Sequence, residues 1–73
     1  MVLVFKTSVR KQKQVKRLKP LLNTLTGGKD FWNFDLEDCD HILRIESDSL
    51  QVDEVVRTLH KMNFSCEELE DYH

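Results

Sequence analysis

The chain has 73 residues, which is enough for one small domain and too few for two hydrophobic cores. It contains only two cysteines, which excludes the disulfide framework of small secreted domains, and its apolar run before Lys6 is far shorter than a signal peptide or a membrane span. We therefore expect a cytoplasmic protein with a single domain, residues 1–73, and no contact with a membrane.

The formal net charge of −2 conceals an uneven distribution of charge along the chain. Residues 1–29 contain eight of the 11 lysines and arginines and no acidic residue. Residues 30–73 contain all 13 acidic residues. The sequence therefore predicts a molecule with a basic part and an acidic part.

The first third of the chain reads as a strand followed by a helix. Residues 2–5 (VLVF) are β-favouring and predict the first strand. Apolar residues recur every three or four positions over residues 15–25, which predicts a helix, and Ser8 is its expected N-cap. Residues 27–28, two glycines, are expected to end the helix in a left-handed conformation.

Pro20 interrupts this helical pattern. A proline in a helix interior lacks an N–H and crowds the carbonyl four residues earlier, here that of Lys16. We expect either a kink near Lys19 or two separate helical pieces.

The middle of the chain predicts a hairpin. Residues 32–37 alternate between apolar and polar, with Trp32 and Phe34 on the same face, and residues 41–46 alternate again. Asp38, Cys39 and Asp40 form the polar turn between the two expected strands.

A second helix and a short last strand complete the pattern. Apolar residues at helical spacing from Val52 to Met62 predict the helix, and Asp53 and Glu54 in its first turn suit the helix dipole. Asn63 is the expected left-handed residue at its C-terminus, and a short strand begins near Phe64.

The resulting order, β-α-β-β-α-β, predicts an α+β fold of the ferredoxin-like class. We expect a four-stranded antiparallel sheet with strand order 4-1-3-2 and two helices on one face. Val2, Val4 and Ile42 should form a small apolar patch on the open face, with Arg44 nearby, which is either a partner site or a set of ordinary exposed aliphatic residues. The expected core consists of Leu3, Phe5, Val15, Leu18, Leu22, Trp32, Phe34, Leu36, Leu43, Ile45, Val52, Val55, Leu59, Phe64 and Cys66.

The second half of the chain resembles the heavy-metal-associated (HMA) domain family of small copper chaperones and of metal-binding domains in metal-pumping ATPases. The resemblance rests on WNFDLE at residues 32–37 and on VDEVVRTLHKMNFSC at residues 52–66, where Asn63 and Phe64 replace the family's Gly-Tyr. The resemblance covers about half the chain and implies the same ferredoxin-like fold.

The loop that binds metal in the HMA family carries Met-x-Cys-x-x-Cys after the first strand. Counting from that strand places Ser8 and Lys11 at the two cysteine positions, and counting back from the glycines places Gln12 and Val15 there. Neither alignment supplies a thiolate, the ligand that selects Cu(I). We therefore expect no cofactor and no metal in this loop.

The basic loop is the strongest candidate site. Thr7, Ser8, Arg10, Lys11 and Lys13 surround the expected helix start, where backbone N–H groups and cationic side chains can bind a phosphate or a carboxylate. The alternative is a charged face covered only by water. The binding interpretation predicts a small anion or an acidic protein partner.

Two further classes of binding remain as alternatives. A displaced zinc or copper site would need Cys39, His41 and Cys66, or His60, to converge, although the expected strand order places the two cysteines near opposite edges of the sheet. Nucleic-acid binding through the first helix is disfavoured because the domain as a whole is acidic and its aromatic residues belong to the buried face.

No set of residues in the sequence suggests an enzyme. A catalytic nucleophile needs a base within hydrogen-bond reach, and the acidic neighbours of Cys39 would raise its pKa rather than activate it. The sequence predicts a non-enzymatic binding or adaptor module.

Overall fold

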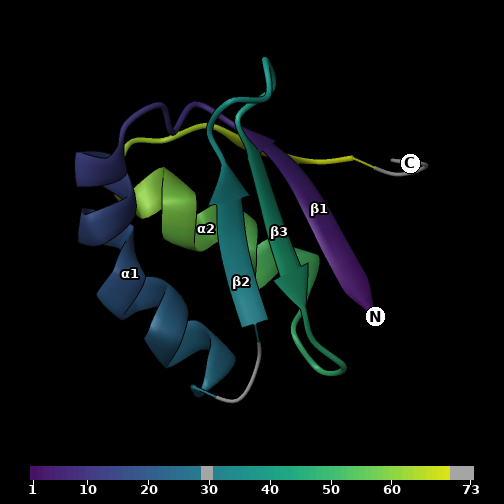
Figure 1. Ribbon diagram of the computed structural model, residues 1–73. Coiled ribbons are helices and arrows are strands. Elements are labelled where there is room, and N and C mark those ends of the chain that lie inside the picture. The colour runs from purple at the N-terminus through teal and green to yellow at the C-terminus, as the bar shows by residue number, and fades with distance from the viewer. Residues whose placement is uncertain (29–30, 70–73) are drawn as a thin grey trace.

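A computed structural model of the chain describes residues 1–28 and 31–69 (Figure 1). It contains six regular elements in the order β-α-β-β-α-β. These are β1 (Val2–Thr7), α1 (Gln12–Thr26), β2 (Phe31–Asp35), β3 (Ile42–Glu46), α2 (Val52–Lys61) and β4 (Cys66–Glu68).

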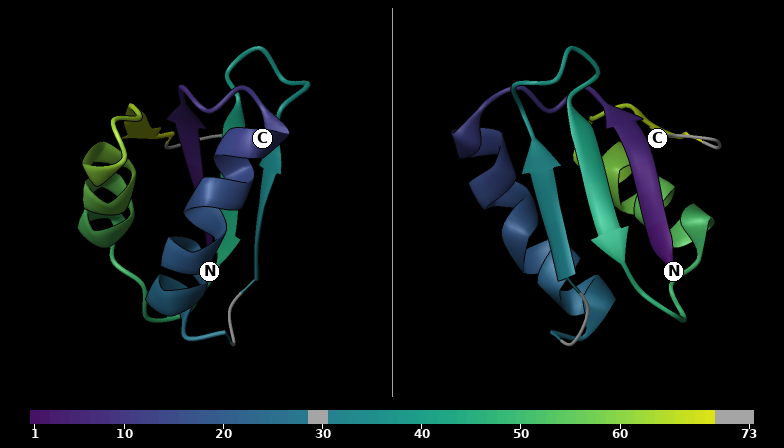
Figure 2. Two further views of the ribbon diagram at one scale, coloured as in Figure 1. Left: turned by 90° about the vertical axis from the view of Figure 1, so that its left-hand side faces the viewer. Right: turned by 45° about the vertical axis from the view of Figure 1, so that its right-hand side comes forward.

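The four strands form one antiparallel sheet in the order β2-β3-β1-β4, which is the expected order read from the opposite edge. Both helices lie on the same side of this sheet, as the edge-on view in Figure 2 shows. The predicted α+β, ferredoxin-like arrangement is therefore confirmed. Neither helix has the length and apolar character needed to cross a membrane within the described part of the chain.

The core lies between the sheet and the two helices. Leu3 opposite Ile45 and Phe5 opposite Leu43 form its sheet side, and all four side chains are buried. Val9 and Leu50, which the apolar spacing did not identify, are also buried. Of the expected core residues, those that pack around the margin and stay partly exposed are Val15, Trp32, Phe34, Leu36 and Val52.

The start of α1 differs from the prediction. The helix begins at Gln12 with Lys11 as its N-cap, so the expectation that Ser8 caps it is wrong. The side chain of Gln14 takes over the capping role: its Oε1 accepts hydrogen bonds from the N–H groups of Arg10 at 2.8 Å and Lys11 at 3.1 Å. A side chain that reaches back from this position accepts hydrogen bonds from backbone N–H groups that have no partner inside the helix.

Pro20 does not divide α1, which runs without a break from Gln12 to Thr26, so the expectation of two helical pieces is wrong. The end of the helix follows the prediction. Gly27 takes a left-handed conformation with φ of 67°, and the N–H of Gly28 donates to the carbonyl of Asn23 at 3.1 Å. The N–H of Gly27 also donates to the carbonyl of Thr24 at 3.3 Å, and these two bonds together form the Schellman arrangement.

The end of α2 repeats this arrangement without glycine. Asn63 has φ of 66°, and the N–H of Phe64 donates to the carbonyl of Leu59 at 3.0 Å. Asn63 is therefore the left-handed residue that the sequence predicted, because asparagine tolerates this conformation better than most residues.

The expected apolar patch on the open face of the sheet is wrong. Val2 is 52% exposed, but Val4 is only 9% exposed and Ile42 only 1%. Val4 lies opposite Arg44, and its carbonyl accepts a hydrogen bond from the N–H of Leu69, so it has neighbours on both sides. Ile42 lies in an inner strand between Lys6 of β1 and Asp35 of β2, and the aliphatic stem of Lys6 can cover it.

Candidate anion and partner surface

Three connections meet at one end of the sheet, beside the start of α1. Thr7 is buried; its hydroxyl donates to the carbonyl of His41 at 2.6 Å and accepts from the N–H of Val9 at 3.2 Å. The Ser8 hydroxyl accepts from the N–H of Ser65 at 2.9 Å, while the N–H of Ser8 donates to the Ser65 carbonyl at 3.3 Å. Both hydroxyls of the candidate site therefore hold loops together.

The three cations of the candidate site lie at the surface. Arg10, Lys11 and Lys13 are all exposed, with Lys11 at the N-cap and Lys13 one residue inside the helix. The first turn of α1 contains no acidic residue. The N–H groups of Gln12 and Lys13 have no acceptor among the residues that the structure describes. An anion at this end would meet these two N–H groups and the three cationic side chains, with Thr7 buried beneath them.

The basic character continues along α1. Its solvent side carries Lys16, Arg17 and Lys19, all exposed, and we call these residues together with Arg10, Lys11 and Lys13 the basic surface. In residues 1–28 and 31–69 the salt bridges are Lys6 to Asp40 and the N-terminal amine to Asp48, and neither involves the basic surface. Six cations therefore gather on one side of the protein without an acidic partner within the described chain.

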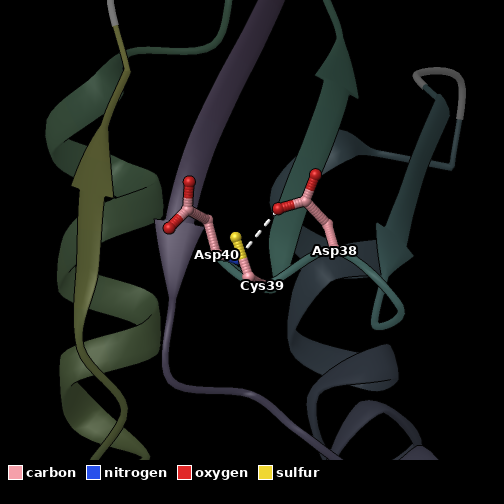
Figure 3. Close-up of side chains that lie close together, drawn as sticks. All are labelled: Asp38, Cys39 and Asp40. Atoms are coloured by element: carbon pink, nitrogen blue, oxygen red, sulfur yellow. Dashed lines mark hydrogen bonds between the residues drawn. The ribbon is translucent and has the colours of Figure 1, made fainter.

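The residues considered for a displaced metal site, Cys39, His41, His60 and Cys66, do not come together in the described part of the chain. Cys39 lies between the carboxylates of Asp38 and Asp40 in the β2–β3 turn (Figure 3), and the candidate ligand atoms of these three residues lie within 4.8 Å of one another. Neither His41 nor Cys66 belongs to this group. The Asp38 carboxylate already accepts a hydrogen bond from the N–H of Asp40 at 2.8 Å, as expected of an acidic turn.

The two cysteines occupy different environments, and both are free. Cys39 is exposed, whereas Cys66 is buried against the core. Burial raises the pKa of the Cys66 thiol from 9.0 to about 12, because the charged thiolate loses its solvation. Forming the thiolate, which is the form that binds a metal, therefore costs more at Cys66 than at a fully solvated cysteine.

Comparison of the chain with protein-family models, with curated proteins and with solved structures gives no match. The surface of this protein is therefore the feature that indicates its function. Its most distinctive property is the basic surface. The six residues of this surface are all cationic and exposed, and none of them forms a salt bridge within the described residues.

Proposed function

We propose that this protein is a non-enzymatic binding or adaptor module, related to HMA domains but lacking their metal-binding cysteines, that takes an acidic partner or anion on its basic surface. The observation that supports the proposal is that six exposed cations form no salt bridge with any residue that the structure describes. Like charges kept close together repel one another, and a negatively charged partner relieves that repulsion.

The location of the surface supports the same function. Its cations sit on a helix and on the loop before it, and that loop is anchored by Thr7 to the β2–β3 turn and by Ser8 to the residues before β4. Groups fixed by a rigid scaffold lose less entropy on binding than groups on a free loop. The described acidic residues lie outside α1 and the loop before it: they occur in β2, β3 and β4, in the connections on either side of β3, and on α2.

Binding of acidic probes tests the proposal. A fluorescent oligoglutamate peptide represents an acidic polypeptide, inorganic phosphate represents a small anion, and a single-stranded oligonucleotide represents nucleic acid. We expect the oligoglutamate to bind with an affinity that falls as salt is added. The double variant Arg10→Glu/Lys11→Glu should weaken this binding at least about tenfold, equivalent to about 1.4 kcal/mol.

The matched control reverses two exposed cations on the other helix, Arg57→Glu/Lys61→Glu, which changes the net charge by the same amount. This control should weaken binding less than about threefold, because neither cation belongs to the basic surface. Equal losses in the two variants, or no binding of any acidic probe, would remove the proposal. Preference for the oligonucleotide over the peptide would assign the surface to nucleic acid instead.

A further inference from the structure

The hydrogen bonds of the sheet show which backbone groups of β3 face β2. The N–H of Ser47 donates to the carbonyl of Met1 at 2.9 Å, so these two residues bond directly across the β1–β3 pair. Bonded pairs alternate along an antiparallel ladder, which makes Leu3 and Ile45 the next such pair. The intervening residue Arg44 must therefore direct its N–H and C=O away from β1 and toward β2.

The same alternation identifies the free groups of β2. Asn33 lies opposite Arg44, so its N–H and C=O bond to β3. The residues on either side of it, Trp32 and Phe34, then direct their backbone groups away from the sheet. Because β2 is the first strand of the order β2-β3-β1-β4, those groups lie along an edge with no further strand in the described chain.

This edge lacks two of the usual protections against strand pairing, lysine and proline. Exposed edge strands commonly contain lysine, proline or a bulge that prevents another strand from joining. Residues 31–35, FWNFD, contain neither lysine nor proline, and three of the five are aromatic. Phe31 is 56% exposed, and Trp32 and Phe34 are half-buried.

One flank of α1 lies directly above this edge. The Oδ1 of Asn23 accepts a hydrogen bond from the Nε1 of Trp32 at 3.0 Å, which fixes Asn23 on the side of the helix nearest β2. Lys19 and Lys16 precede Asn23 by four and seven residues, so they share its stripe on the helix. Figure 1 shows α1 running beside β2 in the opposite direction.

The spacing along the two elements brings this stripe into register with the edge. Four helical residues rise about 6 Å and two strand residues about 7 Å, so Lys19 lies approximately level with Phe34 when Asn23 is level with Trp32. Lys16 lies one turn further along the edge. Both lysines are exposed and have no salt bridge among the described residues.

We propose that the free edge of β2 binds an extended acidic peptide segment as an additional strand of the sheet. The backbone groups of Trp32 and Phe34 hydrogen-bond to the peptide, and its carboxylates on the helix side meet Lys16 and Lys19. Backbone pairing supplies affinity and alternate side chains supply specificity in this mode of recognition. The inference rests on the proposed function, because it takes the same class of partner and adds how that partner is held.

Charge decides between an acidic peptide and a second copy of this chain. Symmetrical pairing of two β2 edges would place the flanks of the two α1 helices beside each other, with Lys16 and Lys19 of one copy near those of its partner. Like charges at short distance oppose that arrangement, whereas carboxylates of an acidic segment neutralise the same lysines.

Amide hydrogen exchange followed by NMR tests the inference. The probe is a peptide of about eight residues that alternates glutamate with threonine, a β-favouring residue. In the free protein the amides of Trp32 and Phe34 should exchange rapidly and that of Asn33 slowly. Saturation with the peptide should slow exchange at Trp32 and Phe34 at least about tenfold, because their N–H groups gain acceptors.

Two matched controls separate strand addition from attraction between opposite charges. A peptide with the same sequence but N-methylated glutamate amides keeps its charge and loses the donors that face β2, and it should bind at least about tenfold more weakly. Lys19→Glu should weaken peptide binding about tenfold, while Arg57→Glu should weaken it less than about threefold. Arg57 is an exposed cation on α2 and does not belong to the basic surface.

Each remaining outcome overturns the inference. Equal binding of both peptides without protection of Trp32 and Phe34, together with loss of binding in Arg10→Glu/Lys11→Glu, would remove strand addition and leave the proposed function standing. Failure of the unmodified peptide to bind while oligoglutamate binds would do the same. Protection of both amides in the free protein, with the mass of a dimer in sedimentation, would assign the edge to a second copy.

Discussion

The Thr7 hydroxyl donates a hydrogen bond of 2.6 Å to the carbonyl of His41, linking the end of β1 to the residue before β3. The N–H of Thr7 donates to the carbonyl of Asp40 at 3.2 Å, so this one residue fixes both sides of the junction. His41 adopts a left-handed conformation with φ of 49°, which is not an extended conformation, so β3 begins only at Ile42. The expectation that His41 begins the strand pattern is therefore one residue too early.

Replacing Thr7 with valine should destabilise the protein. Valine has nearly the same shape, but it leaves the His41 carbonyl and the Val9 N–H without their partner in a buried site. We expect the free energy of unfolding, measured by urea denaturation, to fall by about 1–3 kcal/mol. Thr7→Ser keeps the hydroxyl and should lose clearly less; equal stability of wild type and Thr7→Val would contradict the assigned role.

Asn63 should show the residue preference of a left-handed helix terminus. Asn63→Ala forces a residue with a Cβ but no local hydrogen-bonding side chain into φ of 66°, and should lower the free energy of unfolding by about 1 kcal/mol. Asn63→Gly should be at least as stable as the wild type, because glycine adopts this conformation without steric cost. Thermal unfolding of both variants measures the difference in stability. If Asn63→Gly were less stable than Asn63→Ala, the prediction would be contradicted.

Stability at alkaline pH should depend on Cys66. Its pKa is raised to about 12 in the folded protein, so the unfolded chain, with a pKa near 9.0, releases this proton first. The contribution is fully present below the unfolded pKa and is lost as pH rises toward the folded value. The free energy of unfolding should therefore decline above about pH 9, by at most about 1.4 kcal/mol per pH unit from this group.

The Cys66→Val variant isolates this effect, because it removes the thiol and keeps an apolar side chain of similar size in β4. The difference in unfolding free energy between wild type and Cys66→Val should change above about pH 9 in favour of the variant. Cys39→Ser is the control and should follow the wild type, since Cys39 is exposed. Parallel pH profiles for wild type and Cys66→Val would show that the buried thiol has no such role.

The sequence predicts the element order well because each element has a strong local signal. The alternation around Trp32 and Phe34 and the helical spacing of Val55 and Leu59 both depend only on neighbouring residues, and the structure confirms them. Sequence reasoning misses Val9, which lies in a connection rather than in either periodic segment, yet is fully buried.

Long-range contacts account for the remaining differences. Ser8 has a capping hydroxyl at a plausible distance before the helix, but that oxygen accepts from the N–H of Ser65, 57 residues away in sequence. Ile42 has the parity of the open face, yet it lies in an inner strand and is covered by its neighbours. The exposure of the basic surface was predictable from charge, whereas the flank that Lys16 and Lys19 share with Asn23 required the Trp32 contact.

Pro20 should be the residue of α1 whose replacement stabilises the protein most. The helix is continuous through it, so the carbonyl of Lys16 loses its usual donor, and interior proline costs about 3 kcal/mol relative to alanine. Pro20→Ala should raise the free energy of unfolding by about 1–3 kcal/mol, whereas its exposed neighbour Lys19→Ala should change it by less than about 0.5 kcal/mol. Chemical denaturation of the two variants decides the matter. A less stable Pro20→Ala variant would mean that the geometry proline imposes on α1 is needed to seat Leu18 and Leu22 in the core.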